Sequence, residues 1–196
     1  MDSLADRIAE APRSTVDGTW ERHLAARHVA TALEGYTALG RWGTADGFPV
    51  LYLGRPRESV VVEAYRHLVD PVEDPMPASA FVPRVCVSAT VAINEVLDLR
   101  SAAARVTIDI PMDVLQSSTD DRGAYRRCQE VSAVAHQLGL HGLVAPAATG
   151  RGHTLVVFPD KLTVGERLVQ VDIENWNQLP ADPRSRGRRG NLRVVD

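Results

Sequence analysis

Arg41, Tyr52 and Glu63 recur at an even interval of eleven residues in the first third of the chain. A guanidinium can hold a diphosphate through two parallel hydrogen bonds, and a tyrosine ring can stack on a planar base. A carboxylate can stabilise the positive charge that develops on a sugar when its glycosidic bond breaks. Because no packing rule requires this triplet, we interpret it as a candidate site for a dinucleotide.

Each of the three residues also has a structural interpretation. Arg41 precedes Trp42 in a Gly-Arg-Trp-Gly segment, so that it can stack on the indole ring in a surface turn. Tyr52 lies between two leucines, as a core aromatic residue does. Glu63 can be a solvated glutamate on a helix. The residues by themselves leave both interpretations open.

The elements around the triplet favour a cleft. Residues 49–53 form a compact apolar run that predicts a buried strand with Tyr52 near its end. Residues 58–69 have apolar side chains at helical spacing, which predicts a helix. Glu63 falls off the main apolar stripe of this helix and shares a second, partly apolar face, where a carboxylate can lie over a cleft.

The rest of the chain predicts an α+β protein of one domain. We expect strands at residues 18–24, 84–93, 140–144, 154–158 and 167–173, a short helix within 25–39, a helix at 124–138, a short strand or turn at 97–99, a hairpin turn at 150–154, a surface loop at 70–83 and irregular structure at 109–123. Strands and helices mix without a regular βαβ alternation, which favours an α+β fold over a doubly wound sheet.

The composition is that of one soluble globular domain. The 196 residues are 44% hydrophobic and 24% charged, enough for a substantial core. We expect a cytoplasmic protein, because no apolar run is long enough to span a membrane and the first residues lack the order of a secretory signal. Cys86 and Cys128 form no C-x-x-C motif, and the histidines show no ligand spacing, so we predict reduced thiols and no metal.

Charge is unevenly distributed along the chain. The net charge is −3, yet residues 180–196 carry five arginines and two aspartates, a net charge of +3 that leaves −6 on the rest. A negative body argues against direct nucleic-acid binding. Residues 180–196 have little to bury and predict a disordered basic tail, and residues 1–17 predict a polar lead-in.

Several short blocks, in the same order, resemble the RES domain family. The blocks are GTWERH at 18–23, GRW at 40–42, VLYL at 50–53, Glu63, VLDLR at 96–100, Cys128-Gln129, GLVAP at 142–146 and LVVF at 155–158. The resemblance covers residues 18–179, which we take as the RES domain. It implies an ADP-ribosyltransferase-like mixed sheet with flanking helices.

The resemblance also implies a function and a partner. RES proteins are the toxins of RES–Xre toxin–antitoxin pairs and consume NAD as a substrate. An Xre-type helix-turn-helix antitoxin is therefore the expected partner, in a hetero-oligomer.

The family's site residues fall on residues of this chain. Arg22 and Arg41 would hold the diphosphate, Tyr52 would stack on the nicotinamide, and Glu63 would stabilise the ribose cation. His23 stands where some relatives place a tyrosine, and it can stack or form hydrogen bonds. The late serine of many relatives has no clear counterpart, since Ser132 lies four residues past Cys128.

Three functions follow as hypotheses. The first is an NAD-consuming toxin that transfers the ADP-ribosyl group to water, phosphate or a protein. The second, motivated by the serine, is a degenerate RES protein that binds a nucleotide or an antitoxin without turnover. The third is a nucleic-acid module that acts through the arginine-rich tail, which the acidic body disfavours.

Overall fold

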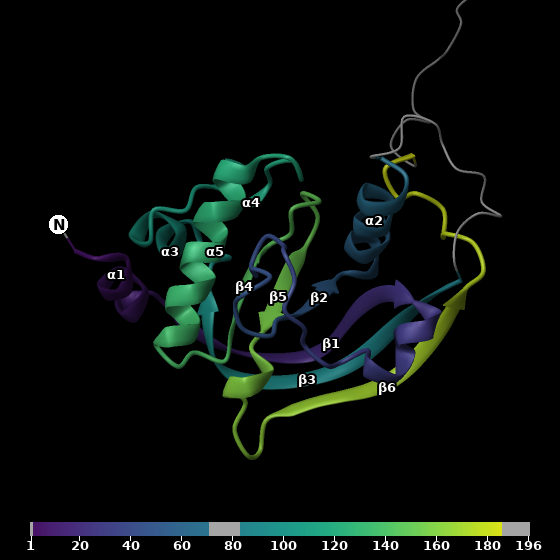
Figure 1. The fold of residues 1–196 in the computed structure, drawn as a ribbon, viewed down its shortest axis with the longest axis horizontal. Helices are drawn as coiled ribbons and strands as arrows, with labels where there is room; N and C mark the ends of the chain where they lie inside the picture. The colour runs from purple at the N-terminus through teal and green to yellow at the C-terminus, as the bar shows by residue number, and fades with distance from the viewer. Residues whose placement is uncertain (1, 71–82, 186–196) are drawn as a thin grey trace, which may run out of the picture.

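The computed structural model describes residues 2–70 and 83–185 and shows a mixed sheet covered by helices (Figure 1). The elements in chain order are α1 (Leu4–Glu10), β1 (Arg13–Ala25), the 3-10 helix η1 (Ala26–Thr31), β2 (Leu51–Arg55), α2 (Arg57–Leu68), β3 (Arg84–Asp98), α3 (Ala102–Thr107), α4 (Met112–Leu115), α5 (Arg122–Gln137), β4 (Gly142–Pro146), β5 (His153–Val157), the 3-10 helix η3 (Pro159–Lys161) and β6 (Arg167–Trp176). The α+β class predicted from the sequence is confirmed.

The sheet closes on itself. Its strand order is β1-β2-β5-β4-β3-β6, and β1 also pairs with β3, so that five strands form a closed ring and β6 extends it along β3. The β3–β4 pair is parallel and the other pairs are antiparallel. The β1–β3 ladder is long, with Trp20 opposite Ala89 near its middle. This ladder fixes Arg22 and His23 on the same sheet as β2.

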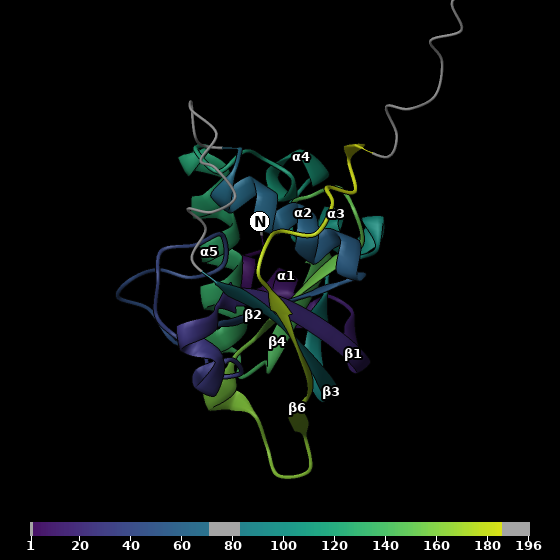
Figure 2. The same ribbon diagram turned by 90° about the vertical axis from the view of Figure 1, so that its right-hand side faces the viewer.

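The two largest apolar clusters among the described residues lie inside the ring of strands and between the sheet and the helices. One is lined by side chains from all five strands of the ring: Val16, Trp20, Leu51, Leu53, Val91, Ile93, Val96, Val144, Leu155 and Val157. The other packs α1 and α5 against the sheet, with Cys128, Val131 and Ala135 as the buried stripe of α5. The helical spacing of these three residues is the signal from which the sequence predicts α5. In both Figure 1 and Figure 2, α2 and α4 lie at the top and the turn before β6 lies at the bottom.

The expected elements are present, with different limits at several ends. The first strand begins at Arg13, well before the expected residue 18, and β3 continues to Asp98 through the expected short strand. The segment 109–123, expected to be irregular, contains α4. The hairpin turn expected at 150–154 joins β4 to β5, and Gly152 has a φ of 66° there. A Cβ at Gly152 would lie 2.1 Å from the carbonyl oxygen of Arg55, so only glycine fits.

The two ends of the described chain pack against the domain. Ser3 and Asp6 form a capping box on α1, and Ile8 is fully buried in the core beside α5. Structure therefore begins inside the segment 1–17 that the sequence indicates as a lead-in.

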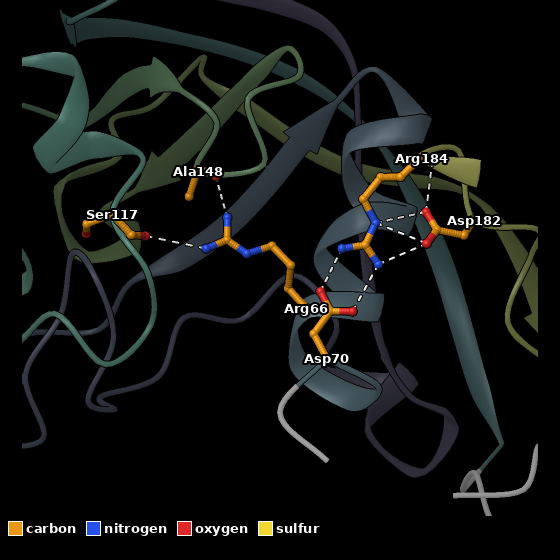
Figure 3. A network of polar contacts seen from close by, with 6 residues as sticks. All are labelled: Arg66, Asp70, Ser117, Ala148, Asp182 and Arg184. Carbon is orange, nitrogen blue, oxygen red and sulfur yellow. Dashed lines mark hydrogen bonds and ion pairs between the residues drawn. The ribbon is translucent and has the colours of Figure 1, made fainter. Parts of the chain in front are cut away.

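Residues 180–185, placed by the sequence in an unstructured tail, lie along α2. The Tyr65 hydroxyl donates to the carbonyl of Pro180, and Arg184 bridges Asp70 and Asp182 (Figure 3). Residues 186–196 and most of the expected loop 70–83 lie outside the described residues. Within residues 2–70 and 83–185, no helix combines the length and apolar character needed to cross a membrane.

Candidate active site

One cavity of about 950 Å³ brings together all five residues that the sequence singles out. Arg22 and His23 come from β1, Arg41 from the turn after η1, Tyr52 from β2 and Glu63 from α2. The N-terminal half of α5 forms the remaining wall. Residues far apart in the sequence thus line one cavity, whose walls come from strands β1 and β2 and from helices α2 and α5.

Glu63 faces the cavity because the neighbouring positions of α2 are buried. Val60, Val61 and Ala64 pack into an apolar cluster, whereas 37% of the Glu63 side chain is exposed. Its single side-chain partner among the described residues is His67, whose Nε2 lies 3.2 Å from Glu63 Oε1. A second carboxylate oxygen therefore stays available to a ligand in the cavity.

Tyr52 supports the turn that carries Arg41. Its hydroxyl oxygen accepts a hydrogen bond of 3.0 Å from the backbone N–H of Trp42, and burial raises the pKa of this hydroxyl. A Cβ at Gly40 would lie 2.9 Å from the same oxygen, so the turn approaches the ring closely. The ring lines the cavity, while the hydroxyl has a structural partner that the sequence did not reveal.

Arg41 is bound mainly by the protein. Its Nη1 donates to the carbonyl of Val114 and to Ser117 Oγ, both at 2.9 Å, and Nη2 donates to the carbonyl of Ser117 at 2.7 Å. Its guanidinium carbon lies 4.5 Å from the ring centroid of Tyr125, so the aromatic partner is Tyr125 and not Trp42. Since a guanidinium has five N–H groups, two remain for a ligand.

Arg66 is a cavity residue that the sequence analysis missed. It donates to the carbonyl of Ala148, in the β4–β5 turn, and to the carbonyl of Ser117 at 3.4 Å (Figure 3). The Ser117 carbonyl thus accepts hydrogen bonds from both Arg41 and Arg66. Its position could have been predicted from the sequence, because Arg66 follows Glu63 by three residues and therefore lies on the same side of the helix.

The cavity face of α5 carries polar residues at helical spacing: Arg122, Tyr125, Arg126 and Gln129. Gln129 Nε2 donates to the carbonyls of Gly40 at 2.7 Å and Gly43 at 3.2 Å, which fastens the Arg41 turn to the helix. Arg122 and Arg126 are exposed, and their side chains have no hydrogen bond or ion pair with any residue in 2–70 or 83–185. Their guanidiniums are available to an anion.

Arg22 and His23, which are adjacent on β1, have different partners. Arg22 Nη1 donates to the carbonyl of Ala32 at 2.7 Å, and burial lowers its pKa. The His23 ring stacks on Trp176, with ring centroids 6.2 Å apart and planes inclined by 11°. Arg84, which the sequence analysis did not consider, donates to His23 Nδ1 from Nη2 at 2.8 Å and from Nε at 3.2 Å.

The lining of the cavity is cationic in a chain of negative net charge. Six arginines line it (Arg22, Arg41, Arg66, Arg84, Arg122 and Arg126) against three carboxylates (Glu21, Glu63 and Asp120). Such a concentration of guanidiniums attracts phosphate groups and steers anions into the cavity. Among the described residues, no group of three or more potential metal ligands occurs.

Serine is present at the cavity, but not where the sequence analysis looked for it. Ser132 is fully buried on the core side of α5, and its hydroxyl has no partner among the described residues. Ser59, from the first turn of α2, lines the cavity, and its Oγ lies 2.9 Å from Thr149 Oγ1.

The family assignment rests on residues 19–178, which match the RES domain. The chain belongs to the RES domain family. It is 32% identical over 157 residues, 79% of this chain and 71% of the relative, to "Probable NAD(+) phosphorylase Rv3189" of Mycobacterium tuberculosis. A chain in the crystal structure of the M. tuberculosis MbcT-MbcA toxin-antitoxin complex has the same fold, with a TM-score of 0.75 and 25% identity over 88% of this chain and 91% of that one.

Proposed function

We propose that this RES domain protein is an NAD-consuming toxin of a toxin–antitoxin pair, which cleaves the bond between nicotinamide and ribose. The observation that carries the proposal is Glu63, a half-exposed carboxylate with one side-chain partner, in a cavity lined by six arginines. The similarity to a protein named as an NAD(+) phosphorylase and to a chain of a toxin–antitoxin complex supports it.

Cleavage of the bond between nicotinamide and ribose gives each of the predicted site residues a role. As the bond between C1″ of the ribose and the nicotinamide nitrogen breaks, nicotinamide leaves with the bonding electrons and positive charge spreads over the ribose ring. Glu63 lowers the free energy of that transition state by its negative charge and can accept a hydrogen bond from a ribose hydroxyl. Tyr52 offers its ring to the nicotinamide, and Arg22 with the two remaining N–H groups of Arg41 orients the diphosphate.

We infer that inorganic phosphate is the acceptor. A phosphate oxygen then forms the new bond to C1″, and the products are nicotinamide, ADP-ribose 1″-phosphate and a proton. The cationic lining favours a second anion in the cavity beside the dinucleotide, which supports phosphate over water or a protein side chain.

The partner is an antitoxin, and we propose that it is of the Xre helix-turn-helix type and forms a hetero-oligomer with this chain in the cytoplasm. An acidic segment of such a partner would find Arg122 and Arg126 without competing ion pairs among residues 2–70 and 83–185. Reversal of charge at Arg126 should then weaken the complex, as measured by calorimetric titration.

The decisive experiment follows nicotinamide release from NAD by the purified protein, freed of any partner. We expect the Glu63→Gln variant to lose release by at least about 100-fold, because the amide carries no negative charge. Glu58→Gln is the matched control on the same helix, since Glu58 is exposed in the first turn and does not line the cavity. Its rate should equal that of the wild type.

The same assay identifies the acceptor and tests the rival function. Mass spectrometry should show ADP-ribose 1″-phosphate in phosphate buffer, whereas ADP-ribose alone would point to water. NAD binding without any nicotinamide release would overturn the enzymatic proposal and favour a binding protein that has lost turnover.

A further inference from the structure

The His23–Arg84 pair is unusual because a histidine on the cavity wall has a cation as its hydrogen-bond partner. His23 lies on β1 opposite Cys86 of β3, and Arg84 lies on the same strand as Cys86. Nη2 of Arg84 is 2.8 Å from His23 Nδ1 and Nε is 3.2 Å from it. Trp176 of β6 stacks on the imidazole and limits its rotation.

This pairing determines where the imidazole carries its proton. A guanidinium can only donate hydrogen bonds, so Nδ1 of His23 must accept with its lone pair. In a neutral imidazole the proton is then on Nε2. Nε2 has no hydrogen-bond partner among residues 2–70 and 83–185, and His23 lines the cavity, so this N–H is available to a ligand.

The groups around His23 also keep it uncharged. Arg84 on β3, Arg22 on β1 and His67 on α2 all face it, and the nearby carboxylates have cationic or imidazole partners of their own: Glu63 contacts His67, and Glu174 of β6 contacts Arg57. Burial, together with these cations, lowers the pKa of His23 to about 3. The ring therefore stays neutral between pH 5 and 8, the range in which an exposed histidine titrates.

We propose that Arg84 is a positioning residue that fixes His23 as a neutral Nε2–H donor, and that His23 donates this hydrogen bond to an oxygen of the bound dinucleotide. The inference rests on the proposed function, because it takes NAD as the ligand. A neutral donor can bind a phosphate or ribose oxygen without changing charge as the pH varies. The ring centroid of His67 lies 6.4 Å from that of His23, and His67 Nε2 lies 3.2 Å from Glu63 Oε1, so the proposed donor and Glu63 lie on the same side of the cavity.

The first test measures the tautomer directly by long-range proton–nitrogen NMR of the imidazole at His23. In the wild type we expect protonation at Nε2 alone and no titration between pH 5 and 8. Arg84→Met removes the donor at Nδ1 and should let the proton occupy both ring nitrogens, whereas Arg84→Lys, which also only donates, should preserve protonation at Nε2. A proton on Nδ1 in the wild type, or protonation at Nε2 alone in Arg84→Met, would overturn the role of Arg84.

The second test addresses the ligand and does not depend on the arginine variants. His23→Leu removes the donor and should weaken NAD binding about tenfold by calorimetry, while His23→Gln keeps a neutral N–H and should lose less. Equal affinity of His23→Leu and the wild type would overturn the hydrogen bond to the dinucleotide. The NMR and binding measurements need no turnover, so they are distinguishable from a failure of the enzymatic proposal, which shows as absent nicotinamide release.

Discussion

Two glutamates in different regions of the molecule show how the same side chain is used for function and for structure. Glu166 lies in the turn before β6, at the bottom of Figure 1, and its side chain is 2% exposed. It accepts hydrogen bonds from the backbone N–H groups of Asn94 and Thr163, from the Thr163 hydroxyl and from His141 Nδ1, at 2.7 to 3.1 Å. Glu63, on α2 at the top, has one histidine partner and 37% exposure.

The difference teaches what to look for in a candidate site. The carboxylate of Glu166 is saturated by local donors, so it stabilises the turn and has no capacity left for a ligand. The carboxylate of Glu63 is left under-coordinated beside a cationic cavity, where a ligand can complete its hydrogen bonds. Proximity to a histidine is common to both and does not discriminate between them.

The comparison predicts opposite phenotypes for the two glutamine variants. Glu166→Gln should lower the free energy of unfolding by about 2 to 4 kcal/mol at pH 7, because charge-assisted hydrogen bonds are lost in a buried turn. Glu63→Gln should change it by less than about 0.5 kcal/mol, as exposed positions do. Urea unfolding of both variants measures this, and comparable losses of stability would erase the distinction.

The stability provided by Glu166 should also depend on pH. Burial opposes ionisation of Glu166, but the hydrogen bonds from Thr163, Asn94 and His141 outweigh it and lower its pKa. A lowered folded-state pKa gives stability that is present above the unfolded value of about 4.3 and is lost as the pH falls through the folded value. The gap between wild type and Glu166→Gln should therefore shrink below about pH 4.

Two arginines of the cavity allow the same comparison, with smaller expected changes in the free energy of unfolding. Arg41→Met removes three hydrogen bonds to residues 114–117 and should cost about 2 kcal/mol of stability, in addition to any loss of NAD binding. Arg126→Met removes no side-chain hydrogen bond or ion pair with a described residue and should cost less than about 0.5 kcal/mol. Thermal unfolding separates the two. If Arg41→Met were as stable as the wild type, its hydrogen bonds to Val114 and Ser117 would not stabilise the fold.

The sequence predicted the elements of the site better than their pairing. Strand β2 and helix α2 were found because strong apolar patterns report which face of a local element is buried, and the same pattern placed Glu63 on the other face. The β1–β3 ladder that closes the sheet was not predicted, since register depends on partners distant in the sequence. For that reason Arg84, brought to His23 from β3, was missed.

The sequence also did not reveal which groups the cavity arginines bind. Arg41 was interpreted as a ligand-binding residue, whereas three of its five N–H groups bind a segment over 70 residues away, two of them through backbone carbonyls. Every residue has a backbone carbonyl, so no side-chain pattern in this segment predicts which carbonyls will accept hydrogen bonds from Arg41. By contrast, Arg66 and Arg126 lie at helical spacing from Glu63 and Gln129, so a search by helix face would have found both.

The smallest expected effect concerns the two arginines on α5 that have no partner among the described residues. Arg122→Ala and Arg126→Ala should each raise KM for NAD about three- to tenfold and leave kcat unchanged, because an exposed cation adds uniform binding of an anionic substrate. The increase should fade in concentrated salt, which screens exposed charges. Arg127→Ala is the matched control on the same helix, since Arg127 binds Asp109 on the side away from the cavity. If Arg127→Ala raised KM as much, the effect would be one of overall charge, and these arginines would not form a binding wall.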